Sequence, residues 1–95
     1  MYDRILKQMR KKIRTRQYVM TIHAEEEMAD DNLSIFDVEH VVLTGSVIER
    51  QKDQDTAERK YLVEGGTIAG DLAVVVAKIS ITGKLVIISV YAKRR

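Results

Sequence analysis

Residues 18–45, YVMTIHAEEEMADDNLSIFDVEHVVLTG, predict two helices joined by a tight corner. Thr21 is a suitable N-cap for a first helix over Ile22–Asp31, because a threonine hydroxyl can accept from a free backbone N–H of the first turn. Asn32 tolerates the left-handed conformation that ends many helices. Asp30 and Asp31 lie where the helix dipole disfavours an anion, so we expect a cationic neighbour elsewhere in the fold.

The second helix has the clearest local signal in the chain. Ser34 and Asp37 match the capping-box spacing, in which each residue satisfies a backbone N–H of the other. An apolar stripe follows at helical spacing, formed by Val38, Val41 and Val42. We expect a helix from Ser34 to Thr44, with Gly45 in the left-handed conformation at its C-terminal end.

After this helix the apolar period changes to two, which predicts strands. The predicted strands are Ser46–Asp53, Arg59–Glu64, Leu72–Ser80 and Lys84–Lys93. Tyr18–Met20 is either a short strand or an extended connector. The expected fold is α+β, with N-terminal helices packed on a four-stranded antiparallel sheet.

The two faces of the last strand differ in polarity. One face is expected to be apolar throughout, with Val86, Ile88, Val90 and Ala92. The other turns polar towards the C-terminus, with Leu85, Ile87, Ser89, Tyr91 and Lys93. We therefore expect helices on the apolar face, and a half-polar, cationic surface on the reverse.

The N-terminal segment, residues 1–17, predicts a basic helix ahead of a single domain over residues 18–95. Residues 1–16 contain seven Lys or Arg and one Asp, whereas residues 17–58 contain eleven acidic and two basic residues. The helix has a narrow apolar stripe, formed by Tyr2, Ile5, Met9 and Ile13. Three interpretations are open: a helix docked on the sheet, an arm for RNA phosphates or a protein partner, and a membrane-surface helix. The last is least favoured because the stripe lacks Trp and Phe.

Composition narrows the class of protein. Ninety-five residues predict one domain, and the absence of Cys excludes disulfides and thiolate metal sites. No apolar run approaches the roughly 18 residues that span a bilayer, and no secretory segment begins the chain. These features predict a cytoplasmic protein without membrane contact. The charge segregation favours RNA, an acidic partner or self-association into a homo-oligomer.

His23 and Glu27 share a helix face, since they are four residues apart. Such a pair suits acid–base chemistry or two metal ligands, but a metal needs a third ligand and His40 is the only other imidazole. We therefore predict no metal and no cofactor. A structural role for His23 near the helix start is the simpler alternative.

Cleavage of RNA through its own 2′-hydroxyl needs a base, an acid and a cation for the phosphate, and His, Tyr and Lys can supply all three. Candidates of these types on and after the strands are Lys60, Lys78, Tyr91 and Lys93, together with Arg50, Arg59, Tyr61, Arg94 and Arg95. The alternative is that they keep the sheet soluble and blunt its edges.

Short motifs are similar to those of the bacterial and archaeal domain-of-unknown-function family 4258. They are His23-Ala24-x-x-x-Met28, Asn32-Leu33-Ser34-x-x-Asp37-Val38, Gly45-x-Val47-Ile48-Glu49 and Ser89-Val90-Tyr91, and the resemblance covers about Tyr18 to Lys93. It implies a compact fold like that of RelE-type ribonuclease toxins, which need no metal and are neutralised by antitoxin partners. Where the family tends to have two arginines, this chain has Glu27 and Asp31.

Two functional hypotheses follow. In the first, the chain is a toxin-type, metal-independent endoribonuclease or a degenerate relative. The acid–base candidates are then His23 and Tyr91, and the phosphate contacts are Lys60, Lys78 and Lys93. In the second, the chain is a non-catalytic module that binds a protein or RNA, either as a monomer or as a dimer. The acidic residues Glu27 and Asp31 favour this second hypothesis.

Overall fold

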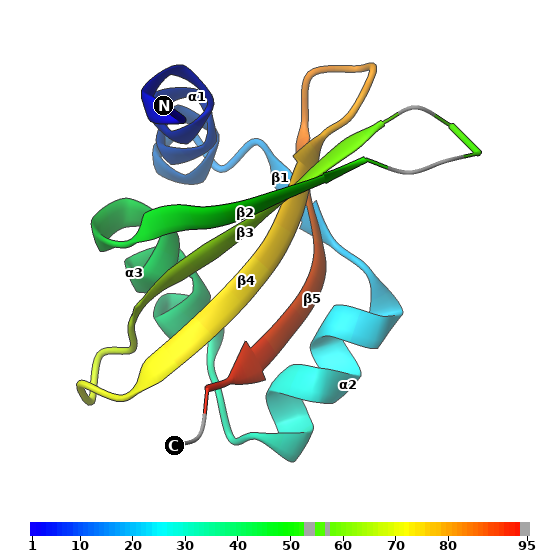
Figure 1. Ribbon diagram of the computed structural model, residues 1–95. Coiled ribbons are helices and arrows are strands. Elements are labelled where there is room, and N and C mark those ends of the chain that lie inside the picture. The colour runs from blue at the N-terminus through cyan, green and yellow to red at the C-terminus, as the bar shows by residue number, and fades with distance from the viewer. Residues whose placement is uncertain (53–54, 57, 94–95) are drawn as a thin grey trace.

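The computed structural model describes residues 1–52, 55–56 and 58–93, which form three helices and five strands (Figure 1). The predicted strand residue Asp53 and the candidate cations Arg94 and Arg95 lie outside the described residues. The helices are α1 Asp3–Arg14, α2 Ile22–Asp30 and α3 Ile35–Thr44. The strands are β1 Tyr18–Met20, β2 Ser46–Lys52, β3 Arg59–Gly66, β4 Leu72–Ile79 and β5 Leu85–Ala92.

The sheet is mixed and five-stranded, with the order β1-β5-β4-β3-β2. The prediction of four antiparallel strands was therefore wrong, because Tyr18–Met20 pairs in parallel with Leu85–Ile87. The Leu85 amide donates to the Gln17 carbonyl, and the Thr21 amide donates to the Ile87 carbonyl. These bonds satisfy backbone groups that β5 would otherwise leave unpaired at its edge.

An irregularity in β5 changes which of its side chains face the core. Val76 pairs with Ser89 and Ala77 pairs with Ile87, so Ile88 is an extra residue on β5. A bulge of this kind reverses the alternation of side chains along a strand. Leu85, Ile87 and Val90 consequently share the buried face. The predicted faces were wrong for the first half of this strand.

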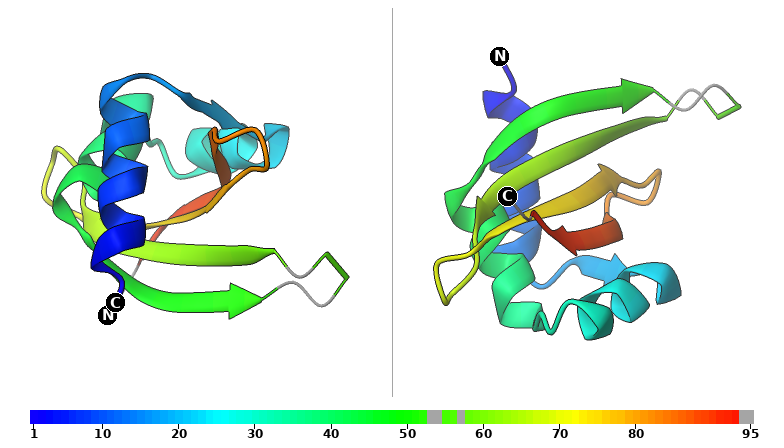
Figure 2. Two further views of the ribbon diagram at one scale, coloured as in Figure 1. Left: turned by 90° about the horizontal axis from the view of Figure 1, so that it is seen from above. Right: turned by 60° about the horizontal axis from the view of Figure 1, so that its bottom comes forward.

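The core lies between the sheet and the helices. α3 packs against β3 and β4, α1 packs mainly against α3, and α2 lies along β5 (Figures 1 and 2). Met9 and Ile13 on α1 are buried, so the C-terminal half of the apolar stripe lies in the core. The helix is docked, but its main contact is α3, and its contact with the predicted partner, the sheet, is the smaller one at β5. Among the described residues, no helix is long and apolar enough to cross a bilayer.

The helix corner forms as its capping residues predict. The Thr21 hydroxyl accepts from the Ala24 amide, and Ser34 and Asp37 form the complete capping box. Asn32 has φ of 56°, as expected for the residue that ends the first helix. The Asp37 carboxylate also accepts from the Ile68 amide. The Ser34 amide and this second bond stabilise the anion, so the pKa of Asp37 is lowered.

Gly45 does not have the left-handed conformation that we expected. Its φ of −87° and ψ of −166° are extended, so its requirement for glycine is one of space. A Cβ on Gly45 would lie 2.3 Å from the Glu64 carbonyl oxygen and 2.5 Å from that of Val41. The end of α3 is capped instead by Arg10, whose Nε and Nη2 donate to the carbonyls of Val42 and Gly45 at 3.0 and 2.8 Å.

Candidate functional site

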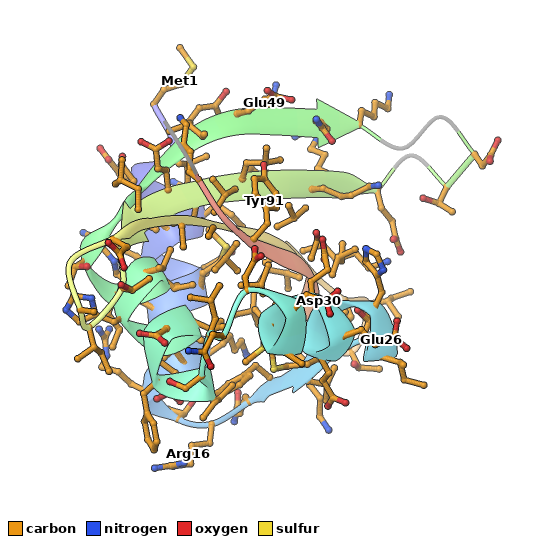
Figure 3. All side chains as sticks on the ribbon, turned by 90° about the horizontal axis from the view of Figure 1, so that it is seen from below. Met1, Arg16, Glu26, Asp30, Glu49 and Tyr91 are labelled. Atoms are coloured by element: carbon orange, nitrogen blue, oxygen red, sulfur yellow. The ribbon has the colours of Figure 1, made fainter. Side chains whose placement is uncertain are left out.

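Polar residues gather on two opposite sides of the sheet. The first set, here called the reverse face, points away from α1 and α3. Two cross-strand rows define this face: one joins Leu62, Val76 and Ser89, and the other joins Glu64, Val74 and Tyr91. Because side chains alternate between the two faces along a strand, Lys60 on β3 and Lys78 on β4 belong to the same face. Viewed from below, Tyr91 stands in front of the sheet and α1 lies behind it (Figure 3). The reverse face therefore carries Lys60, Lys78 and Tyr91, which are three of the five residues predicted for ribonuclease chemistry. Lys93 directly follows β5 and contacts this face at Glu64.

Most of the cations at the reverse face are paired with carboxylates. Lys78 Nζ lies 2.5 Å from Glu58 Oε2, and Lys93 Nζ contacts Glu64 Oε2. Each pair neutralises a lysine that was predicted to contact phosphate, which leaves Lys60 without a carboxylate partner among the described residues. The surface offers little net positive charge to a polyanion.

His23 and Glu27 meet at the border of the reverse face. One carboxylate oxygen, Glu27 Oε1, accepts from Ser89 Oγ at 2.6 Å and from the Val90 amide at 3.2 Å. His23 Nε2 lies 3.2 Å from the same oxygen, and the imidazole side chain is 68% exposed. The carboxylate thus lies between the imidazole and the hydroxyl. A base that activates a nucleophile must contact its hydroxyl directly, and this His does not.

The two predicted acid–base residues are on neighbouring elements. Tyr91 follows Ser89 by two residues on the same face of β5, which is about 7 Å along a strand. His23 reaches Ser89 only through Glu27. The structure brings both to the same part of the molecule, and their catalytic roles stay a prediction.

The acidic residues of α2 have a structural function that we did not expect. β1 ends at Met20, opposite Ile87, so it leaves the rest of the β5 edge unpaired. Glu27 accepts from the Val90 amide there, and Asp31 Oδ2 accepts from the Ala92 amide at 2.8 Å. Both carboxylates thus accept from backbone amides of β5. This accounts physically for carboxylates at both positions.

The second polar set lines two adjoining pockets along α1, here called the α1 groove. The first pocket, of about 260 Å³, is lined by Met1, Tyr2, Arg4, Ile5, Gln8, Arg50 and Tyr61. The second, of about 320 Å³, is lined by Gln8, Lys11, Lys12, Ile79 and Gly83. Gln8 belongs to both, so the pockets adjoin. In the left view of Figure 2, α1 lies in front, and the β2–β3 and β4–β5 hairpins extend to the right of it.

The charges of the α1 groove are all of one sign. Its four charged residues are Arg4, Lys11, Lys12 and Arg50, and no carboxylate among the described residues lines either pocket. None of the four takes part in a salt bridge within residues 1–52, 55–56 and 58–93. Lys12 Nζ donates to the neutral Gln17 side chain. These cations are therefore available to an anionic ligand.

Sequence reasoning found this surface only in part. The charge segregation indicated a basic α1, and Arg50 and Tyr61 were among the strand candidates. Tyr2 was assigned to the apolar stripe, although its ring faces Tyr61 at the groove. No sequence signal placed β2 beside the start of α1, because that contact depends on how α1 docks.

His40 and Tyr18 are two further titratable groups that have hydrogen-bond partners. His40 Nδ1 lies 2.6 Å from the Gly66 carbonyl oxygen. No group of three His, Asp or Glu side chains gathers within the part of the chain that the structure describes. The Tyr18 hydroxyl donates to Glu39 at 2.5 Å, and burial with this bond raises the pKa of Tyr18 to about 12.

A known family matches most of the chain. The model of a family described as "Domain of unknown function (DUF4258)" matches residues 20–92, which include every element except α1 and the first residues of β1. No curated protein and no solved structure matches the chain.

Proposed function

We propose a function for this chain, which belongs to the DUF4258 family. It is a non-catalytic RNA-binding domain, and its contact surface is the α1 groove. One observation carries the proposal: two adjoining pockets have only basic residues among their charged lining. Binding to nucleic acid depends above all on cations that replace the counterions of the phosphates.

The aromatic residues of the groove favour RNA over an acidic protein. Proteins that hold single strands combine a basic groove with aromatic rings on which bases stack. The α1 groove has this combination in Tyr2 and Tyr61, next to Arg4 and Arg50. An acidic peptide would use the cations but has no use for the rings.

The reverse face supports cleavage less well. Lys78 and Lys93 form salt bridges with carboxylates. The Glu27 carboxylate contacts the His23 imidazole and accepts from the Ser89 hydroxyl. Cleavage would need a cation, a base and an acid to converge on one phosphate. We therefore assign binding without cleavage, on the side of the sheet away from Tyr91.

The test compares two variants that each remove three positive charges. The groove variant is Arg4→Gln with Lys11→Gln and Arg50→Gln, and the reverse-face variant is Lys60→Gln with Lys78→Gln and Lys93→Gln. Fluorescence anisotropy with an unstructured, labelled RNA is followed from 50 to 200 mM salt in the presence of a chelator. Each lost phosphate contact lowers the slope of log K against log [salt] by about 0.7, so the groove variant should lose about 2 from the slope.

Three results would overturn the proposal. The first is RNA binding that depends on the reverse-face variant and not on the groove variant. The second is the absence of salt-sensitive binding by the unaltered protein at 50 mM salt. The third is RNA cleavage in chelator that is lost in both His23→Ala and Tyr91→Phe, which would restore the ribonuclease hypothesis.

A further inference from the structure

We infer that the pocket at the N-terminal end of α1 receives one unpaired nucleobase, so that the chain selects single-stranded RNA over duplex. The inference rests on the proposed function and specifies its ligand. Its basis is the arrangement of two tyrosine rings and one guanidinium at this pocket, which lies on the opposite side of the sheet from Tyr91.

The aromatic pair is built from two distant parts of the chain. The rings of Tyr2 and Tyr61 meet edge to face, with centroids 6.2 Å apart and an interplanar angle of 75°. The Arg50 guanidinium carbon lies 6.0 Å from the Tyr2 ring centroid. Both tyrosines are half-buried, so each ring is held by its surroundings and still borders solvent. Rings ordered before binding lose little entropy when a ligand stacks on them.

The dimensions of the pocket suit one flat ring system. Its volume of about 260 Å³ is below the roughly 300–1,000 Å³ of sites for drug-sized ligands. Tyr2, Tyr61 and Ile5 provide apolar and aromatic wall, and Gln8 can donate to or accept from a base edge. A base within a duplex has neither its face nor its pairing edge free for such contacts.

The charges around this pocket fit a base that is still attached to its strand. Arg4 and Arg50 lie at the same pocket as the rings, and Lys11 and Lys12 line the adjoining one. From Arg4 to Lys12 the helix axis rises about 12 Å, so the cations extend beyond a single nucleotide. A free nucleobase would leave these cations unused, whereas a strand places phosphates along them.

The experiment compares three RNA probes of one sequence and length in the anisotropy assay: the single strand, its duplex, and a strand in which the bases are replaced by abasic sites. The abasic strand keeps the phosphates and removes the stacking. We expect the single strand to bind at least about tenfold more tightly than either of the others, because one stacked base contributes about that factor or more.

Variants locate the selectivity in the pocket. Tyr61→Leu should weaken single-strand binding about tenfold and leave abasic-strand binding unchanged, and Tyr61→Phe should retain the preference. Tyr2→Leu is a second variant in case Tyr61→Leu lowers the folded fraction, which circular dichroism measures. Phe36→Leu is the matched control, since Phe36 on α3 is 62% exposed and lines neither pocket.

The outcomes separate this inference from the proposed function. Equal affinity for the single strand and the abasic strand overturns the inference and leaves RNA binding by the groove intact. Equal affinity for strand and duplex does the same. Failure of the unaltered protein to bind all three probes overturns both. A single-strand preference that persists in Tyr61→Leu and Tyr2→Leu overturns the assignment of the pocket.

Discussion

Replacing Glu27 with alanine should destabilise the fold, because it removes the carboxylate oxygen that accepts hydrogen bonds from Ser89 and Val90. Glu27 Oε1 accepts from Ser89 Oγ and from the Val90 amide, and it contacts His23 Nε2. Val90 is 1% exposed, so its amide has no ready alternative partner. The edge of β5 depends on this carboxylate because β1 stops short of it.

The expected magnitude follows from the donors that lose their partner. A buried amide without an acceptor costs about 1–3 kcal/mol, and the lost hydroxyl bond costs about 0.5–1.5 kcal/mol. The Glu27 side chain is 26% exposed, so water can enter and recover part of this. We expect Glu27→Ala to lower the free energy of unfolding by about 2 kcal/mol. For a domain of this size, that lowers Tm by about 8–16 °C.

The measurement is urea denaturation together with thermal unfolding, with Glu26→Ala as the control. Glu26 is the exposed neighbour on the same helix, and Figure 3 shows it on the outer side of α2. Its replacement carries the same change in helix propensity and charge. A double-mutant cycle of Glu27→Ala with Ser89→Ala should give a coupling energy of about 1 kcal/mol. If Glu27→Ala and Glu26→Ala agree within about 0.5 kcal/mol, the edge-capping role is refuted.

Three further predictions concern the helix ends. Gly45→Ala should cost more than about 3 kcal/mol in a denaturant melt, because its Cβ would meet two backbone carbonyls, whereas Gly66→Ala, with nothing within 4 Å, should stay within about 1 kcal/mol; similar values for both would contradict the steric argument. Arg10→Met should cost about 2 kcal/mol by removing two donors from the end of α3, with partial recovery in Arg10→Lys; a neutral Arg10→Met would disprove the cap. The lowered pKa of Asp37 contributes stability that is complete above the ordinary value of 3.8 and is lost as pH falls through the lower folded-state value. Unfolding free energy should therefore fall less steeply below pH 3.8 in Asp37→Asn than in the unaltered protein, and parallel curves would contradict this.

Several features of the chain could be predicted from the sequence because they depend on residues close together in it. The capping box of Ser34 and Asp37, the N-cap of Thr21 and the left-handed Asn32 all lie where spacing alone indicates them. Each involves bonds that span four residues or fewer, so the local order of residues already contains the partners. The period of two located β2 to β5 within a residue or two for the same reason.

Other features were decided only by tertiary structure. The parallel pairing of β1, the bulge at Ile88 and the close approach at Gly45 depend on which strands become neighbours. The predicted site residues are placed by similar long-range contacts. Sequence reasoning paired His23 with Tyr91 as acid–base candidates, but it did not predict that Glu27 would lie between His23 and Ser89.

The sequence by itself determined the elements, their caps and the basic character of α1. Tertiary structure decided that the cations of α1 and of β2 line one groove, and that lysines of the reverse face pair with carboxylates. The physical reason is distance along the chain: Tyr61 meets Tyr2 from 59 positions away, and Lys78 and Lys93 pair with carboxylates that are 20 and 29 positions away. No local pattern specifies such partners, because they meet only when the whole core has packed.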